Sequence, residues 1–326
     1  MVKNNFVNLL VSYRAPGKPS SKAHLERDNL RSAVFWRGAA AECLALVLFI
    51  PLGPGASVGW TGGNTPSNLL IAFSNGLAIA TLIQCFGHVS GAHFNPAVTI
   101  SLALVRQVSI VKAVVYIAAQ CIGATGGAAI LRIISPVDKR SFIGMTRINY
   151  AEDVSLWQGF ALELFITFHL VLMVFATIDN DRKDLRGSPA VAIGFTVATG
   201  LMYGIPYTGA SMNPARSFGP ALVNWVWTDQ WVYWAAPIGA GILATLVYQS
   251  LFAEKALILR ETSCRRTTDG ESAPNGRHSE VIDEVMYASH GQYIKKDYRR
   301  LDTVTFDLNS SPYSARAAWG TSNTRV

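Results

Sequence analysis

Residues 91–97 read Gly-Ala-His-Phe-Asn-Pro-Ala, and residues 209–215 read Gly-Ala-Ser-Met-Asn-Pro-Ala. The two copies lie 118 residues apart and share five of their seven positions. Each Asn-Pro-Ala opens an apolar segment, 95–105 in the first copy and 213–224 in the second. Both segments are too short to cross a bilayer, which takes about 20 residues. Two such segments in matching context indicate a duplicated architecture.

Six longer apolar stretches surround the two copies, and each is long enough to cross a bilayer. They run roughly over residues 35–53, 68–87, 111–134, 156–178, 188–206 and 231–253. None alternates with a period of two, so helices are expected rather than barrel strands. Irregular or short elements survive at membrane depth only where they are buried in protein or line water. The sequence therefore predicts an all-α membrane protein with six transmembrane helices, two re-entrant half-helices and a cavity.

Charged residues gather at the two ends of the chain. They make up only 15% of the 326 residues, below the roughly 25% of soluble proteins. Residues 33–253 hold 11 of the 28 Lys and Arg and 9 of the 21 Asp and Glu. We expect a membrane domain there, between an arm at 1–32 and a tail at 254–326 without a helical or strand period, for which we expect disorder. The net charge of +7 forms no basic stripe, so nucleic acid is not an expected partner.

The membrane domain divides into repeats at about 33–134 and 156–253, each with three spans and one half-helix. Because three is an odd number, the two repeats insert with opposite orientations. Inverted repeats are common in transport proteins, whose substrate path lies near the bilayer midplane. The arm carries six Lys and Arg, and the loop at 53–67 carries none. Both termini are therefore expected on the cytoplasmic side.

One carboxylate precedes each Asn-Pro-Ala inside an apolar span. Glu42 and Glu163 lie 121 residues apart, and such a charge must face protein or a lumen because it is costly in lipid. They could relay protons in a coupled transporter, or they could accept hydrogen bonds from the irregular loops before the half-helices. Their symmetric placement favours the second interpretation.

These features resemble the aquaporin (major intrinsic protein) family. The resemblance covers about 33–253 and rests on residues 87–99, Ala-Ala-Gln at 118–120 and Asn-Pro-Ala-Arg-Ser-Phe-Gly-Pro-Ala at 213–221. The sequence is most similar to that of the classical water-channel branch, which includes the glial aquaporin and its insect relatives. The resemblance implies a multi-pass plasma-membrane protein and a homotetramer with one channel in each subunit. No enzyme activity, cofactor or metal is expected.

The two Asn-Pro-Ala motifs, called boxes below, also have a physical interpretation. They comprise Asn95, Pro96 and Ala97, and Asn213, Pro214 and Ala215. Asn is a favoured helix cap and Pro a favoured first residue, so each asparagine is expected to cap a half-helix and donate its NH₂ toward the lumen. Two opposed helix N-termini, each partially positive, would interrupt a proton wire and repel cations.

The resemblance places the narrowest constriction at Asn75, Leu201, Ala210 and Arg216. Arg216 directly follows the second box and would donate to passing solutes. In strict water channels the first two positions are typically phenylalanine and histidine. Leu201 instead supplies an apolar wall and Asn75 a smaller side chain, which predicts passage of glycerol, and of urea, beside water.

Alternative interpretations remain at this point. Ser217, Ala221 and Tyr233 are the residue types typical of water channels at these positions, so a strictly water-selective channel is the runner-up. A proton-coupled secondary transporter that uses the two carboxylates is a third. His88 and His93 lack neighbouring metal-ligand residues and are expected to support the loop and line the pore entrance.

Overall fold

Six helices of the computed structural model are long and apolar enough to cross a membrane, within the residues that it describes. The described residues are 30–59, 66–139, 144–179, 182, 187–253, 287–289 and 292–294. The six helices are α3 (Ala33–Leu52), α4 (Asn68–Ser90), α6 (Ile110–Ile134), α7 (Leu156–Ile178), α8 (Pro189–Thr208) and α10 (Val232–Val247), which the π-helix η4 (Tyr248–Phe252) continues. The predicted all-α membrane fold is confirmed, with boundaries within three residues of the expected ones.

Serine hydroxyls begin most of these helices. The N-caps of α3, α4, α6, α7 and α8 are all serines whose side chain accepts a backbone N–H of the first turn, namely Ser32, Ser67, Ser109, Ser155 and Ser188. Such a cap satisfies one of the N–H groups that a helix start leaves without a partner. The sequence thus marks the start of five spans with one residue type.

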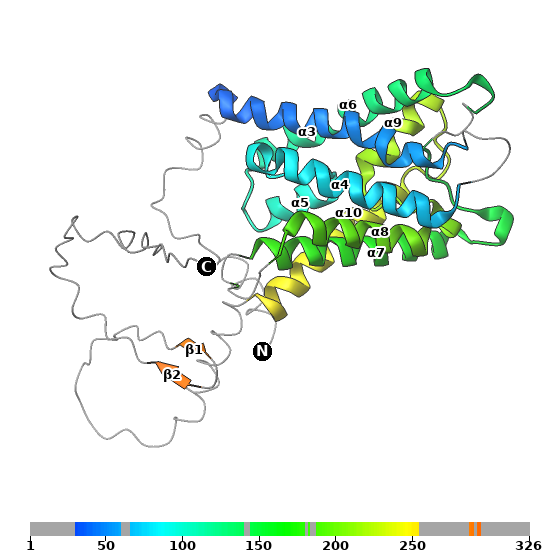
Figure 1. Cartoon of the computed structure of the whole chain (residues 1–326). Coiled ribbons are helices and arrows are strands. Elements are labelled where there is room, and N and C mark those ends of the chain that lie inside the picture. The colour runs from blue at the N-terminus through cyan, green and yellow to red at the C-terminus, as the bar shows by residue number, and fades with distance from the viewer. Residues whose placement is uncertain are drawn as a thin grey trace, which may run out of the picture. The chain divides into compact units, whose positions relative to one another are not determined.

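The two predicted half-helices are α5 (Pro96–Leu104) and α9 (Pro214–Asn224). The long helices run side by side, with α5 in one half of their length and α9 in the other (Figure 1). Helix α5 packs against α6 and α10, and α9 packs against α6. The two half-helices therefore enter from opposite ends of the bundle, as an inverted repeat requires.

Glycines let the long helices approach closely. A Cβ added to Gly76 of α4 would lie 2.5 Å from the carbonyl oxygen of Gly194 in α8, and the reverse distance is also 2.5 Å. On the opposite side, a Cβ on Gly127 of α6 would lie 2.8 Å from the carbonyl oxygen of Leu46 in α3. Helices in membranes gain packing contacts through such small residues, and here they draw the repeats around the half-helices.

Short elements occupy the connections and the tail. Among the described residues, 3₁₀ turns lie at η1 (Pro54–Ser57), η2 (Val137–Lys139) and η3 (Tyr150–Glu152). Residues 269–326 form a separate unit, in which β1 (Tyr287–Ser289) pairs antiparallel with β2 (Gln292–Ile294). Apart from these six residues, the tail at 254–326 lies outside the described residues, so the disorder expected there stays a prediction.

Candidate functional site

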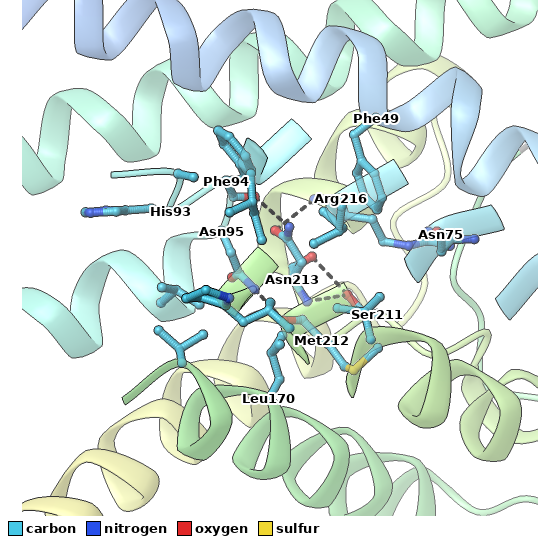
Figure 2. Close-up of a pocket in the computed structure, with 18 of the residues that line it drawn as sticks. Phe49, Asn75, His93, Phe94, Asn95, Leu170, Ser211, Met212, Asn213 and Arg216 are labelled. Carbon is cyan, nitrogen blue, oxygen red and sulfur yellow. Dashed lines mark hydrogen bonds between the residues drawn. The ribbon is translucent and has the colours of Figure 1, made fainter. Parts of the chain in front are cut away.

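A cavity of about 150 Å³ lies where the two half-helices meet. Its wall comes from α3, α4, α5, α7, α8, α9 and the loops before both half-helices. Figure 2 shows Asn95 and Asn213 next to each other at its centre. The six-helix bundle therefore positions the two boxes as the centre of one shared site.

The two asparagines cap their helices and also bridge the repeats. The Oδ1 atoms accept from the N–H groups of Ala97, at 2.9 Å, and of Ala215, at 3.0 Å. Asn95 Nδ2 donates to the Met212 carbonyl and Asn213 Nδ2 to the Phe94 carbonyl, each at 2.7 Å. Because an amide NH₂ carries two hydrogens, each asparagine keeps one for the cavity. One hydrogen of each NH₂ is used on the facing loop, and the expected donation of the other toward the lumen stays a prediction.

The loops before the half-helices have a strained backbone in both repeats. Ala92 and Phe94 have φ of 51° and 49°, and Ala210 and Met212 have φ of 50° and 54°. Positive φ is uncommon for residues other than glycine and costs free energy unless the surroundings hold it. The same strain in both copies indicates a shared requirement, which is to turn the carbonyl and N–H groups of each loop toward defined partners.

The two buried carboxylates hold these strained loops. Glu42 accepts from the N–H groups of His93, at 3.0 Å, and of Phe94, at 2.6 Å, and also from Gln120 Nε2, at 2.8 Å. Both carboxylates have no exposed surface, and neither lines the cavity. Their position is that of loop supports and offers no route to the lumen.

Glu163 holds the second loop in the same way. Its oxygens accept from the N–H groups of Ser211, at 2.9 Å, and of Met212, at 3.0 Å. The Thr208 hydroxyl donates a third hydrogen bond at 2.6 Å. Glu42 also has a side-chain hydrogen bond with Ser90, so each carboxylate receives two donors from the backbone of its strained loop and further donors from side chains.

Arg216 lies in the first turn of α9 and lines the cavity with only 5% of its surface exposed. Its Nη1 donates to the carbonyl of Gly144 at 2.6 Å. Gly144 has φ of 67°, a conformation that glycine adopts at little cost. The sequence analysis did not predict this partner. The only feature that could have indicated it is a glycine in the loop between two spans.

The other three predicted constriction residues line the same cavity. Leu201 projects from α8 and Ala210 from the loop before the second box, and both are buried. Asn75 of α4 donates from Nδ2 to the Ile71 carbonyl of its own helix at 2.8 Å. The structure thus brings together all four positions that were counted from the boxes.

An aromatic side chain beside Asn75 was not predicted. Phe49 of α3 lines the cavity and is 4% exposed. A Cβ on Gly53 would lie 2.8 Å from the Phe49 ring and 2.9 Å from Asn75 Oδ1, so both side chains pack on the same glycine. Phe49 therefore supplies an aromatic wall next to Asn75, the position that was expected to match a phenylalanine of strict water channels.

The two histidines near the first box have different surroundings. His93 is buried and lines the cavity, its Nδ1 lies 3.2 Å from Thr99 Oγ1, and its ring packs against Tyr116. His88 lies on an exposed position of the last turn of α4 and is not among the residues of the cavity wall. The structure therefore brings only His93 into the site.

Comparison with known proteins agrees with this geometry. The family model described as Major intrinsic protein matches residues 29–248. Aquaporin-4 of Mus musculus is 40% identical over 281 residues, which covers 85% of this chain and 81% of that protein. The lens fiber major intrinsic protein of Oryctolagus cuniculus is 42% identical over 256 residues, which covers 76% and 95%.

A solved structure shares the fold. The aquaglyceroporin from Plasmodium falciparum superposes with a TM-score of 0.62 and 23% identity. The match covers 68% of this chain and 99% of that one. At this level of identity the likeness concerns the arrangement of helices alone.

Proposed function

Because this chain belongs to the major intrinsic protein family, we propose that its cavity conducts water together with small neutral solutes, of which glycerol is the first candidate and urea the second. The family's members are membrane channels, so the chain is a multi-pass channel and no enzyme. The observation that carries the solute proposal is the wall of the cavity. Arg216 lines it as a donor and Leu201 as an apolar side chain, which suits the hydroxyl and CH groups of a polyol.

Conduction is passive and excludes protons in this proposal. Asn95 and Asn213 line the cavity at the N-termini of the half-helices, and the second amide hydrogen of each is left to donate to a water molecule there. A water molecule between two such donors turns its oxygen to both, which interrupts a hydrogen-bonded proton path. The partial positive charges of the two helix N-termini add a barrier to cations.

We expect vesicles that contain the purified protein to swell with water and glycerol but to dissipate no pH gradient. Osmotic water flux, glycerol uptake and proton leak are to be measured in one preparation, with empty vesicles as the control. Water flux without glycerol uptake would favour the strictly water-selective alternative, which Ser217 and Ala221 beside Arg216 make the runner-up. Glycerol uptake that follows an imposed pH gradient would support the coupled transporter instead.

A homotetramer in the plasma membrane with cytoplasmic termini completes the proposal. His169 has an exposed position near the middle of α7. A polar side chain at this depth is costly against lipid and normally faces protein. A neighbouring copy of the chain would cover it, and large apolar side chains such as Phe165 on the same helix are exposed beside it.

Mercury sensitivity is expected to be low. In many family members the residue three before the second asparagine is a cysteine that mercury blocks, and here it is Ala210, which lines the cavity. The described cysteines, Cys43, Cys85 and Cys121, lie outside the cavity wall. Ala210→Cys should therefore create a mercury block of water flux that a thiol reductant reverses. Strong block of the unaltered protein that disappears with Cys85→Ser or Cys121→Ser would show that the pore wall is assigned incorrectly.

A further inference from the structure

Three buried hydroxyl groups form a line between the loop at 144–149 and the second box. Thr146 Oγ1 donates to Ser217 Oγ at 2.7 Å, and Ser217 Oγ also contacts Ser211 Oγ. Ser211 Oγ donates to the Asn213 carbonyl at 2.9 Å. All three hydroxyl-bearing residues are at most 4% exposed. Thr146 and Ser217 also lie outside the cavity wall, so water does not compete for the bond between them.

The direction of the line follows from the hydrogens available. Each hydroxyl carries one hydrogen, and that of Ser211 is used on the Asn213 carbonyl. Ser217 must then donate to Ser211, and it accepts from Thr146. Thr146, whose hydroxyl also has a side-chain hydrogen bond with Tyr233 of α10, thus stands at the start of a chain that ends on the backbone of the box asparagine.

The loop itself is fastened independently of this chain. The N–H of Arg147 donates to the Thr208 carbonyl at 3.0 Å, and the N–H of Asn149 to the Tyr207 carbonyl at 2.8 Å. Asn149 Nδ2 adds a bond to the Pro206 carbonyl at 3.0 Å. The end of α8 therefore holds the loop in place even when the Thr146 hydroxyl is removed.

Two contacts from this loop meet at Arg216. The Gly144 carbonyl accepts from the guanidinium, and two residues further on Thr146 binds Ser217, the next residue after Arg216. We propose that Thr146 is a positioning residue of the constriction, which fixes the first turn of α9 so that the Arg216 guanidinium stays at the pore wall. The inference rests on the proposed function where it concerns solute choice, because a displaced guanidinium loses alignment with a polyol before it obstructs water.

The first test measures the charge of the constriction and needs no glycerol conduction. Cys43, Cys85, Cys121 and Cys264 are first replaced by serine, and Ala210→Cys then introduces a single thiol in the cavity. The rates at which this thiol reacts with a cationic and with a neutral methanethiosulfonate reagent are measured. Thr146→Val keeps the side-chain shape without the hydroxyl. This variant should raise the ratio of the reaction rate of the cationic reagent to that of the neutral reagent about threefold, which corresponds to about 0.7 kcal/mol. Thr146→Ser should restore the original ratio.

A matched control and a second variant complete the experiment. Thr245 is equally buried, but its hydroxyl donates to the Gly241 carbonyl of its own helix, so Thr245→Val should leave the ratio unchanged. Ser217→Ala removes the acceptor and should reproduce the effect, and the double variant should add little because both changes remove the same Thr146–Ser217 bond. An unchanged ratio in both single variants, failure of Thr146→Ser to restore it, or an equal effect of Thr245→Val would overturn the inference.

The second readout is the ratio of glycerol to water flux without the cysteine. It should fall about threefold in Thr146→Val and recover in Thr146→Ser. If the unaltered protein passes no glycerol, the proposed solute range fails while the reagent ratio still decides the role of Thr146. If glycerol passes and neither ratio responds, the proposed function stands and the role of Thr146 is rejected.

Discussion

Leu201→His should lower the glycerol flux about tenfold relative to the water flux, equivalent to about 1.4 kcal/mol in the barrier for glycerol. Leu201 is 2% exposed and lines the cavity with Arg216. An imidazole there would narrow the passage and place a polar group where the CH groups of glycerol pass. A single water molecule needs less width and can bond to the new ring, so water flux should change little. Stopped-flow swelling of vesicles measures both quantities.

A conservative variant separates chemistry from packing. Leu201→Met keeps an apolar side chain of similar volume, a change that cores tolerate well, and should retain most of the original flux ratio. Adding Asn75→Phe to Leu201→His should lower glycerol flux further, because two aromatic rings, Phe49 and the new one, would then share the space over Gly53. An unchanged ratio in well-folded Leu201→His protein would remove Leu201 from the constriction.

Most of the fold follows from local signals in the chain. Apolar length predicted the six spans, and the two Asn-Pro-Ala segments predicted α5 and α9 nearly to the residue. Asparagine caps and prolines at the first helical position act within one turn. They therefore remain visible in a single sequence.

Parts of the site depend on contacts that no local pattern encodes. Gly144 meets Arg216 from 72 positions away, in a connection without periodicity. Phe49 is one of many aromatic residues in apolar spans, and only the packing of α3 on α4 over Gly53 brings it beside Asn75. The bridging bonds of Asn95 and Asn213 likewise require both repeats to be folded.

Glu163→Gln should destabilise the protein by about 1–3 kcal/mol, because a buried backbone donor would lose its partner. Glu163 Oε2 accepts from the N–H of Met212, and Oε1 accepts from Ser211 and Thr208. Glutamine keeps one oxygen and has an NH₂ group in place of the other, and this NH₂ group cannot accept a hydrogen bond at either position. The lost hydrogen bond is one that holds a strained loop, in which Met212 has φ of 54°. The substitution therefore removes part of the interaction that offsets this backbone strain.

Thermal inactivation of water flux should therefore begin at a lower temperature in Glu163→Gln, with a lower yield of assembled protein. Glu42→Gln should behave alike, since Glu42 holds the N–H of Phe94 in the mirrored loop. Glu152→Gln is the control, because that side chain is exposed outside the spans, and it should leave stability unchanged. The carboxylates act through the loops that they hold, so the protein that still folds should conduct water at its usual rate per channel. Normal thermal stability of Glu163→Gln, combined with loss of a pH-driven flux, would instead identify the carboxylate as a coupling site.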